Sequence, residues 1–216
     1  MTTPPTPRYD YEHSPEAIYR QSFATIRAEA DLLGLAEDVR PVAVRMIHAC
    51  GDPGLVDELV SHPALVTATR DALAAGAPIF TDAMMIASGI TRRRLPKDND
   101  IVCRLDDPRA RELARSWRTT RSAAAVSLWG PRVAGSVVAI GNAPTALFHL
   151  LELIADGGHR PAAIIGIPVG FVGSAESKRA LADNPWDIPF LVVHGRRGGS
   201  ALCVAAINAL AQESEL

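Results

Sequence analysis

The sequence predicts an α/β protein: a doubly wound, mostly parallel sheet with helices on both faces, in a single domain preceded by N-terminal helices. Three observations support this fold class. From residue 78 onward, short apolar runs alternate with helical patterns. The last three runs are almost uniformly apolar, which is typical of strands that are covered on both faces of a parallel sheet. Each of these three is followed by a glycine-containing loop and a helical pattern, the order of a strand–loop–helix unit.

The N-terminal region is expected to contain a short disordered tail and then two helices. Residues 1–8 hold three prolines and three threonines and have little apolar surface to bury, so we expect residues 9–216 to form the domain. The first helix is predicted to begin with Ser14 as its N-cap and Pro15 at its first position. One face of this helix should carry five apolar or small hydroxyl side chains: Ile18, Ser22, Thr25, Ile26 and Leu33.

The second helix is predicted over about residues 39–50 and should end at Gly51, since glycine is the usual residue just past a helix. Apolar residues at spacings of three and four predict its buried face: Val42, Ala43, Met46, Ile47 and Cys50. Arg45 and His48 lie about one turn apart on the same helix. A histidine in such surroundings is either a structural residue or a lone acid or base.

Five runs are candidate strands: "PIFT" (78–81), "DIVCRL" (100–105), "SVVAIG" (136–141), "AAIIGI" (162–167) and "FLVVH" (190–194). The loops after the last three should meet at the carboxyl ends of the strands and line one crevice. There the helices that begin near Pro144, Ser174 and Ser200 would offer backbone N–H groups to an anion. The alternative is that the glycines of these loops only form tight turns.

Composition and spacing argue against several classes of protein. A formal net charge of -2 argues against a nucleic-acid partner. Three isolated cysteines in apolar stretches indicate reduced core cysteines of a cytoplasmic protein, and the N-terminus has no signal peptide. The longest lightly charged run is interrupted by Gly141, Asn142 and Pro144, which argues against a membrane span. No two histidines are spaced like zinc ligands, and neither a nucleotide fingerprint nor a G-x-S-x-G motif is present.

Arginines gather in "GITRRRLP", "TTRSAAA" and "GRRGGS", in addition to Arg45. A guanidinium group pairs with carboxylates through two parallel hydrogen bonds. A single basic run is usually a solvated face. Several runs on converging loops instead favour a ligand with several carboxylates. A further alternative is an α/β enzyme that acts on a phosphorylated metabolite, with "GRRGGS" as its phosphate site.

Six segments, in this order, resemble the precorrin-8X methylmutase (precorrin isomerase) family of cobalamin biosynthesis: "VAVRMIHACG", "GITRRRLP", "TRSAAA", "SVVAIGNAPTALF", "GIPVGFVGSAESK" and "GRRGGSA". The resemblance extends from about Tyr9 to Ala211, and "GNAPTAL" and "PVGFVGSAESK" are its specific motifs. The chain departs from the family at "VVHGRRGG", where related sequences often have arginine in place of His194. If the family's arginine at this position contacts a substrate carboxylate, His194 puts that contact in doubt.

The resemblance implies an isomerase that needs no cofactor and no metal. Such an enzyme moves a ring-C methyl group from C-11 to C-12 of precorrin-8X and gives hydrogenobyrinate, with His48 as the catalytic proton donor or acceptor. Together with the arginine and loop candidates, it gives nine predicted substrate ligands: Ser22, Arg45, Thr91, Arg92, Arg121, Asn142, Lys178, Arg196 and Arg197. The flat faces of the macrocycle would rest on Phe171, Val172 and Ile140.

The resemblance also implies partners. These are the polycarboxylated corrin precursor, its product and a second copy of the chain, since the family is homodimeric with sites near the subunit boundary. Two alternatives stay open. One is a cobalt-precorrin-8 methylmutase of the cobalt-early route, although overall similarity favours the metal-free substrate. The other is a non-catalytic corrinoid carrier.

Overall fold

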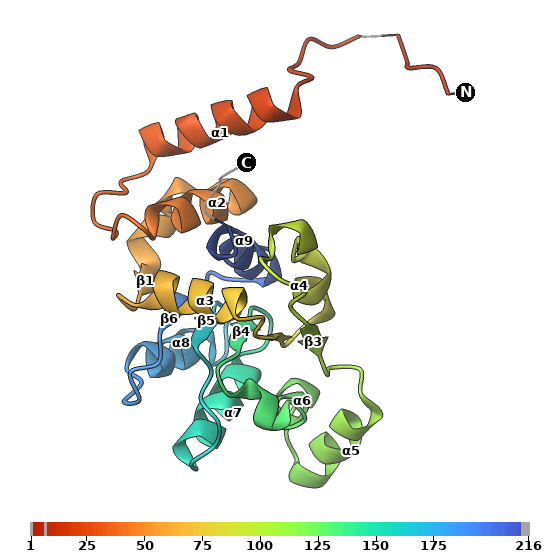
Figure 1. Ribbon diagram of the computed structural model, residues 1–216, viewed down its shortest axis with the longest axis vertical. Coiled ribbons are helices and arrows are strands. Elements are labelled where there is room, and N and C mark those ends of the chain that lie inside the picture. Colours follow the sequence, from red (N-terminus) through yellow and green to blue (C-terminus); the bar gives the residue numbers. More distant parts are fainter. Residues whose placement is uncertain (1, 7, 213–216) are drawn as a thin grey trace.

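The computed structural model describes residues 2–6 and 8–212, which form a six-stranded sheet between two groups of helices (Figure 1). The strands are β1 (Leu59–Ser61), β2 (Ile79–Thr81), β3 (Ile101–Cys103), β4 (Val137–Ile140), β5 (Ala163–Gly166) and β6 (Phe190–Val193). Their order across the sheet is β1-β6-β5-β4-β2-β3. All neighbouring pairs are parallel except β1 with β6.

The five predicted strands are confirmed, and β1 was missed. β1 has three residues, and its pairing with β6 aligns Leu59 with Val193. Its alternation of a buried, an exposed and a half-buried residue is too short to read as a strand pattern. Tertiary pairing, not local sequence, therefore defines this edge strand.

The helices are α1 (Pro15–Glu29), α2 (Arg40–Cys50), α3 (Leu65–Ala74), α4 (Met84–Gly89), α5 (Pro108–Trp117), α6 (Arg121–Ser127), α7 (Pro144–Ala155), α8 (Ser174–Ala182) and α9 (Ser200–Leu210). Three short 3-10 helices are η1 (Pro53–Glu58), η2 (Arg92–Arg94) and η3 (Gly130–Val133), all within the described residues. Among these residues no helix is both long and apolar enough to cross a membrane.

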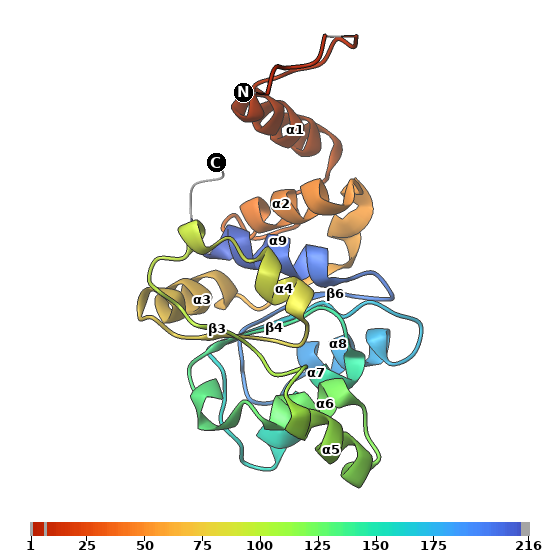
Figure 2. The same ribbon diagram turned by 90° about the vertical axis from the view of Figure 1, so that its right-hand side faces the viewer.

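Helices cover both faces of the sheet, as predicted. Alternate residues of β4 enter different cores: Val137 and Ala139 face the core that includes α2 and α9, whereas Val138 and Ile140 face the core that includes α7. Figure 2 shows α3, α4 and α9 on one side of the sheet and α6, α7 and α8 on the other. On the first side α2 packs on α9 and α1 packs on α2, so two further helical layers lie outside α9.

Helix α1 begins as predicted but ends earlier. Ser14 is the N-cap and its side chain accepts a hydrogen bond from the Ala17 N–H at 3.3 Å. The helix ends at Glu29, so Leu33 lies outside it and is 83% exposed, and its assignment to the apolar face is wrong. Phe23 and Ile26 are the buried residues of α1, because this outermost helix packs mainly against α2. No helix or strand forms in the described residues before Ser14.

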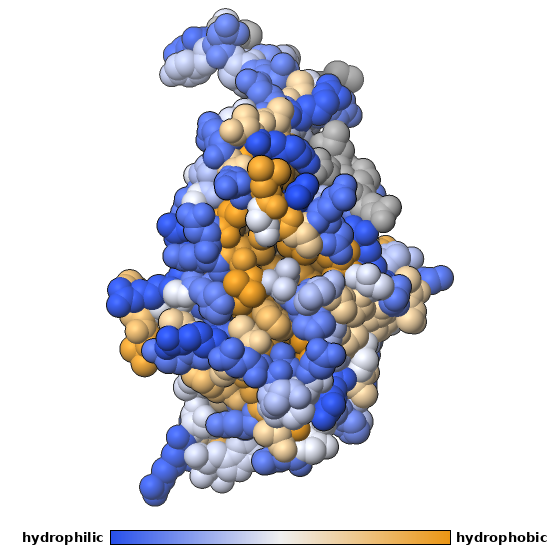
Figure 3. All heavy atoms as spheres, turned by 90° about the vertical axis from the view of Figure 1, so that its left-hand side faces the viewer, coloured by the Kyte–Doolittle hydropathy of each residue, from blue (hydrophilic) through white to orange (hydrophobic). Residues whose placement is uncertain are grey.

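The outer helical layers leave apolar surface uncovered. Ile18 and Tyr19 of α1 are exposed, and so are Met84 and Met85 of α4. Figure 3 shows one side of the molecule, where apolar side chains gather from the level of α2 down to the middle of the molecule, with hydrophilic side chains around them. Such surface is typical of an interaction site.

Helix α2 has the predicted end and most of the predicted buried face. Gly51 closes it in the left-handed conformation at φ 68°, which costs glycine nothing. Val42, Ala43, Met46 and Ile47 are buried. Cys50, the last residue of the helix, is exposed, contrary to prediction. Of the described cysteines only Cys203 is buried in the core.

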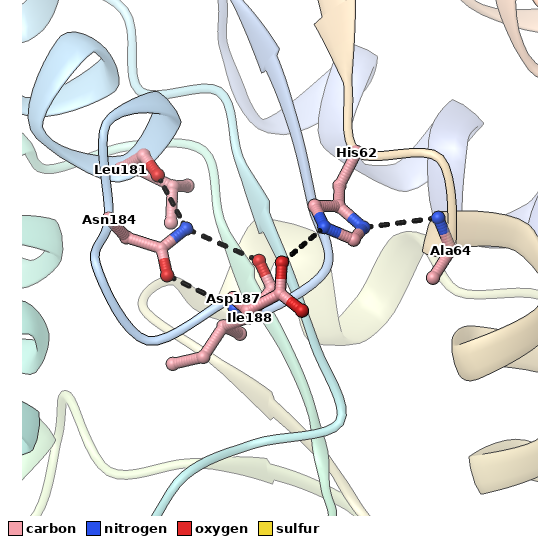
Figure 4. A network of polar contacts seen from close by, with 6 residues as sticks. All are labelled: His62, Ala64, Leu181, Asn184, Asp187 and Ile188. Atoms are coloured by element: carbon pink, nitrogen blue, oxygen red, sulfur yellow. Dashed lines mark hydrogen bonds and ion pairs between the residues drawn. The ribbon is translucent and has the colours of Figure 1, made fainter.

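The end of the sheet that carries the amino ends of the parallel strands is tied by a histidine and an aspartate (Figure 4). The Ala64 N–H donates to His62 Nδ1 at 3.0 Å, so the His62 Nε2–H donates to Asp187 Oδ1 at 2.9 Å. Asp187 has a left-handed backbone at φ 56°. Asn184 holds this turn by bonding both the N–H and the carbonyl of Ile188. His62 is thus a structural histidine that joins β1 to the loop before β6.

Candidate active site

His48 lies in the last turn of α2 and faces α1. Its Nδ1 is hydrogen-bonded to Ser22 Oγ at 2.8 Å. The rings of Tyr19 and Phe23 each lie 5.3 Å from the imidazole centroid, and Phe23 meets it edge-on. Because Ser22 engages Nδ1, Nε2 remains as the nitrogen for a ligand, and it forms no hydrogen bond with any described residue. The ring is therefore oriented on one side and open on the other.

Three adjoining hollows surround this pair of helices. The first, the α1–α2 hollow, has a volume of about 430 Å³ and includes Ser22, Thr25 and His48. The second, the α2–α9 hollow, has a volume of about 330 Å³ and includes Arg45 and His48. The third, the arginine hollow, has a volume of about 260 Å³ and is lined by Pro15, Glu16, Tyr19, Arg45, Thr91, Arg93 and Arg94.

Shared residues connect these hollows. His48 lines the first and second, and Arg45 lines the second and third. Arg45 also lies over the ring of Phe23, 5.6 Å from its centroid. A ligand larger than one hollow could therefore reach the His48 imidazole and several guanidinium groups at once. Of the predicted ligands, the structure brings Ser22, Arg45 and Thr91 to the hollows around His48.

At the carboxyl ends of the strands, a buried carboxylate binds the loop between β4 and α7. β2 and β4 are neighbours there, and Asp82 follows β2. Its carboxylate accepts backbone N–H bonds from Gly141 at 3.0 Å, Asn142 at 3.1 Å and Ala143 at 2.7 Å. The backbone N–H groups just before α7 therefore bind an internal carboxylate, and binding of a ligand anion at this helix start stays a prediction. Burial raises the pKa of Asp82, and the three N–H bonds oppose that rise.

The neighbouring loops are also committed to internal contacts. The Lys178 ammonium is buried and donates to the Arg197 carbonyl oxygen at 2.6 Å. The Arg197 guanidinium donates to the Gly54 carbonyl oxygen at 2.9 Å and lies 3.4 Å from Asp52. A carboxylate beside Arg197 disfavours a phosphate site at "GRRGGS".

Other predicted ligands lie away from His48. Arg196 stacks over the Phe171 ring at 5.1 Å. Arg121 starts α6 on the opposite side of the sheet, 3.7 Å from Asp106 (Figure 1). Arg92 is exposed and lies 4.0 Å from Asp98. Asn142, Lys178 and Arg197 are placed as described above. As substrate ligands these six residues remain predictions.

The predicted apolar walls have different positions. Ile140 is fully buried beneath α7, so it cannot face a macrocycle and that prediction is wrong. Phe171 and Val172 are exposed by 83% and 88% at the tip of the β5–α8 loop. Around His48, apolar walls come instead from Ile18 and Pro53.

Comparison with known proteins defines the relationship of this chain. The sequence profile of the family described as "Precorrin-8X methylmutase" matches residues 17–213. The chain belongs to the precorrin-8X methylmutase family. A mutase moves a group within one molecule, so this is a family of isomerases.

Individual members of the precorrin-8X methylmutase family agree with this assignment. The precorrin-8X methylmutase of Sinorhizobium sp is 57% identical over 206 residues, which are 95% of this chain and 98% of that protein. The cobalt-precorrin-8 methylmutase of Priestia megaterium is 35% identical, over 91% of this chain and 87% of that protein. A solved structure of precorrin-8X methylmutase from Thermus thermophilus superposes with a TM-score of 0.82 at 41% identity, over 91% of this chain and 94% of that chain.

Several residues of the site around His48 were not predicted from the sequence. Tyr19 and Phe23 contact His48 but belong to another helix, and no local pattern relates them to it. Arg93 and Arg94 line the arginine hollow, whereas the predicted Arg92 does not. The three-arginine run was recognised, but only the geometry of η2 decides which side chain faces the hollow.

Lys178 carries a testable consequence for stability. Burial lowers its pKa from 10.5 to about 8, and the Glu58 carboxylate partly opposes this shift. Between these values the unfolded chain binds more protons at this position than the folded chain. The lysine therefore makes the free energy of unfolding rise with pH, by at most about 1.4 kcal/mol per pH unit.

Lys178→Met should remove this contribution. Urea unfolding of wild type and variant at pH 7, 8, 9 and 10 is expected to show wild type gaining stability relative to the variant as the pH rises above 8. If the free energy of unfolding depends on pH in the same way for both proteins over this range, the lowered pKa of Lys178 is refuted.

Proposed function

We propose that this chain is a precorrin-8X methylmutase that converts precorrin-8X into hydrogenobyrinate by moving the ring-C methyl group from C-11 to C-12. The reaction uses no cofactor, and His48 is the proton donor or acceptor. One observation carries this proposal: Ser22 and two aromatic rings orient the His48 imidazole, and its Nε2 remains available to a ligand in the adjoining hollows.

The chemistry follows from that arrangement. The His48 imidazolium donates a proton or a hydrogen bond from Nε2 to the macrocycle near ring C, which shifts the double bonds and allows the methyl group to migrate within the molecule. After the migration the macrocycle returns the proton to Nε2, so that substrate and product are isomers and His48 is again an imidazolium. The Ser22 hydroxyl accepts from Nδ1–H of the imidazolium, and it still accepts from Nδ1–H after Nε2 has given up its proton. A positioned acid of this kind contributes about 10²–10⁴-fold in rate.

The substrate is held by charge at its rim and by apolar contact at its faces. Arg45 lies about one turn before His48 and borders two of the hollows. It binds a carboxylate arm near the reacting ring, with Thr91 beside it. Ile18 and Pro53 provide apolar wall in the α1–α2 hollow.

The metal-free substrate is favoured over its cobalt counterpart. The relative named for precorrin-8X is 57% identical, and the relative named for cobalt-precorrin-8 is 35% identical. Feeding the purified protein each substrate and comparing kcat/KM tests this choice. We expect the higher value with precorrin-8X, and a preference for cobalt-precorrin-8 would overturn it. An unchanged absorption spectrum with both substrates would instead indicate a carrier.

We also propose that the enzyme is a homodimer. Ile18 and Tyr19 on α1, together with Met84 and Met85 on α4, leave apolar surface exposed beside the His48 hollows. A second copy would cover such surface. Sedimentation at micromolar concentration should give the mass of two chains, and a monomer under these conditions would contradict the proposal.

A further inference from the structure

The arginine hollow has an unusual charge composition. Its lining includes three guanidinium groups and one carboxylate, a formal charge of +2. The three arginines come from α2 and η2, and the carboxylate is that of Glu16 at the start of α1. A guanidinium group that lines such a hollow can bind an anion through charge-assisted hydrogen bonds.

The three consecutive arginines of η2 have different surroundings. Arg92 lies by Asp98 and does not line the hollow. Arg94 is half-buried, and its Nε donates to the Asn208 carbonyl oxygen at 2.8 Å, which fixes the side chain on α9. Its pKa is lowered by burial and by the charges of Arg45 and Arg93. Arg93 lines the hollow and forms no ion pair with any described residue.

We propose that Arg93 is a specificity-determining residue that binds one carboxylate arm of the corrin precursor in the arginine hollow, opposite Arg45. This inference rests on the proposed function. A guanidinium group can bind such an arm through two parallel hydrogen bonds, which fixes its direction as well as its position. The Tyr19 ring, which also contacts His48, forms another side of the hollow.

The position of the hollow determines what this contact does. Arg45 borders both the arginine hollow and the hollow that contains His48, and the two residues are about 4.5 Å apart along the axis of α2. An arm held between Arg93 and Arg45 therefore sets the distance between its ring carbon and the His48 Nε2. Arg93 selects substrates that carry a free acid at that distance and disfavours those with a neutral group there.

The adjacent arginines supply a matched experiment. Hydrogenobyrinate binding is measured by absorption titration with wild type, Arg93→Ala, Arg93→Lys and Arg92→Ala, and each protein's melting temperature is recorded. We expect Kd to rise at least tenfold for Arg93→Ala, to rise less for Arg93→Lys, and to stay within twofold for Arg92→Ala. Raising the salt concentration should weaken hydrogenobyrinate binding more in wild type than in Arg93→Ala, because the variant lacks one charge contact that salt screens.

The outcomes separate this inference from the proposed function. Equal effects of Arg93→Ala and Arg92→Ala, or no effect of Arg93→Ala, in proteins that melt like wild type overturn the assignment of Arg93. Failure of wild type to bind hydrogenobyrinate and to convert precorrin-8X overturns the proposed function instead. Arg93→Ala could also weaken binding by destabilising the fold, which a lower melting temperature of that variant alone would show. If Arg93→Lys then binds like wild type, the two-bond contact is refuted, because lysine cannot form it.

Discussion

Replacing His48 with glutamine is expected to lower kcat for precorrin-8X by about 10²–10⁴-fold while Kd for hydrogenobyrinate changes by less than threefold. Glutamine can still bond to Ser22 and still presents a hydrogen-bond donor, but it cannot deliver a proton. Binding of the substrate is assigned instead to Arg45 and its neighbours, which this substitution leaves unchanged. Loss of rate without loss of affinity is the result expected when an interaction acts in the transition state.

A second histidine supplies the control for this variant. His62 bonds Asp187 and the Ala64 N–H on the amino-end side of the sheet, away from the hollows (Figure 4). His62→Gln should lower the free energy of unfolding by about 1 kcal/mol and leave kcat unchanged. If His48→Gln keeps wild-type kcat, or if it unfolds, His48 is a structural residue and another group is the acid.

Replacing Asp82 with alanine is expected to lower the free energy of unfolding by about 3–5 kcal/mol. The Asp82 carboxylate is buried and accepts three backbone N–H bonds, from Gly141, Asn142 and Ala143. Removing it leaves those donors without a partner inside the protein. Each hydrogen bond to a charged group contributes about 1.5–3 kcal/mol, and an unsatisfied buried donor costs a similar amount.

Urea unfolding with circular dichroism measures this effect. Asp98→Ala is the matched control, because Asp98 is fully exposed, and it should stay within about 0.5 kcal/mol of wild type. Asp82→Asn should lie between the two, since its amide retains one acceptor oxygen. A loss below 1 kcal/mol for Asp82→Ala would show that water replaces the carboxylate and that the loop does not depend on it.

The fold class could be predicted because its signals are local. The parallel strands are continuous apolar runs, and the buried face of α2 repeats at helical spacing up to Gly51. β1 could not be found because its strand character depends on pairing with β6. Leu33 was misplaced because no strong local signal marks the end of α1, where the chain leaves the helix at Ala30.

The site was predictable only in its centre. Arg45 and His48 share one helix, so their spacing is encoded locally. The anchoring of the loop before α7 could not be predicted, because the carboxylate that binds its backbone N–H groups belongs to Asp82, about sixty residues earlier in the chain. Which arginine of η2 faces the hollow depends on the geometry of one short turn, and a run of identical residues contains no information about that choice.

The central claim is that this chain moves a methyl group within one corrin precursor by means of a proton held at His48. Its most direct measurement uses a mixture of unlabelled precorrin-8X and precorrin-8X that carries carbon-13 in both the migrating methyl group and the ring. The purified wild-type protein, without added cofactor, should give hydrogenobyrinate whose labelled methyl groups remain on labelled rings, and His48→Gln should give almost none. Labelled methyl groups on unlabelled rings, or equal conversion by His48→Gln, would contradict the claim.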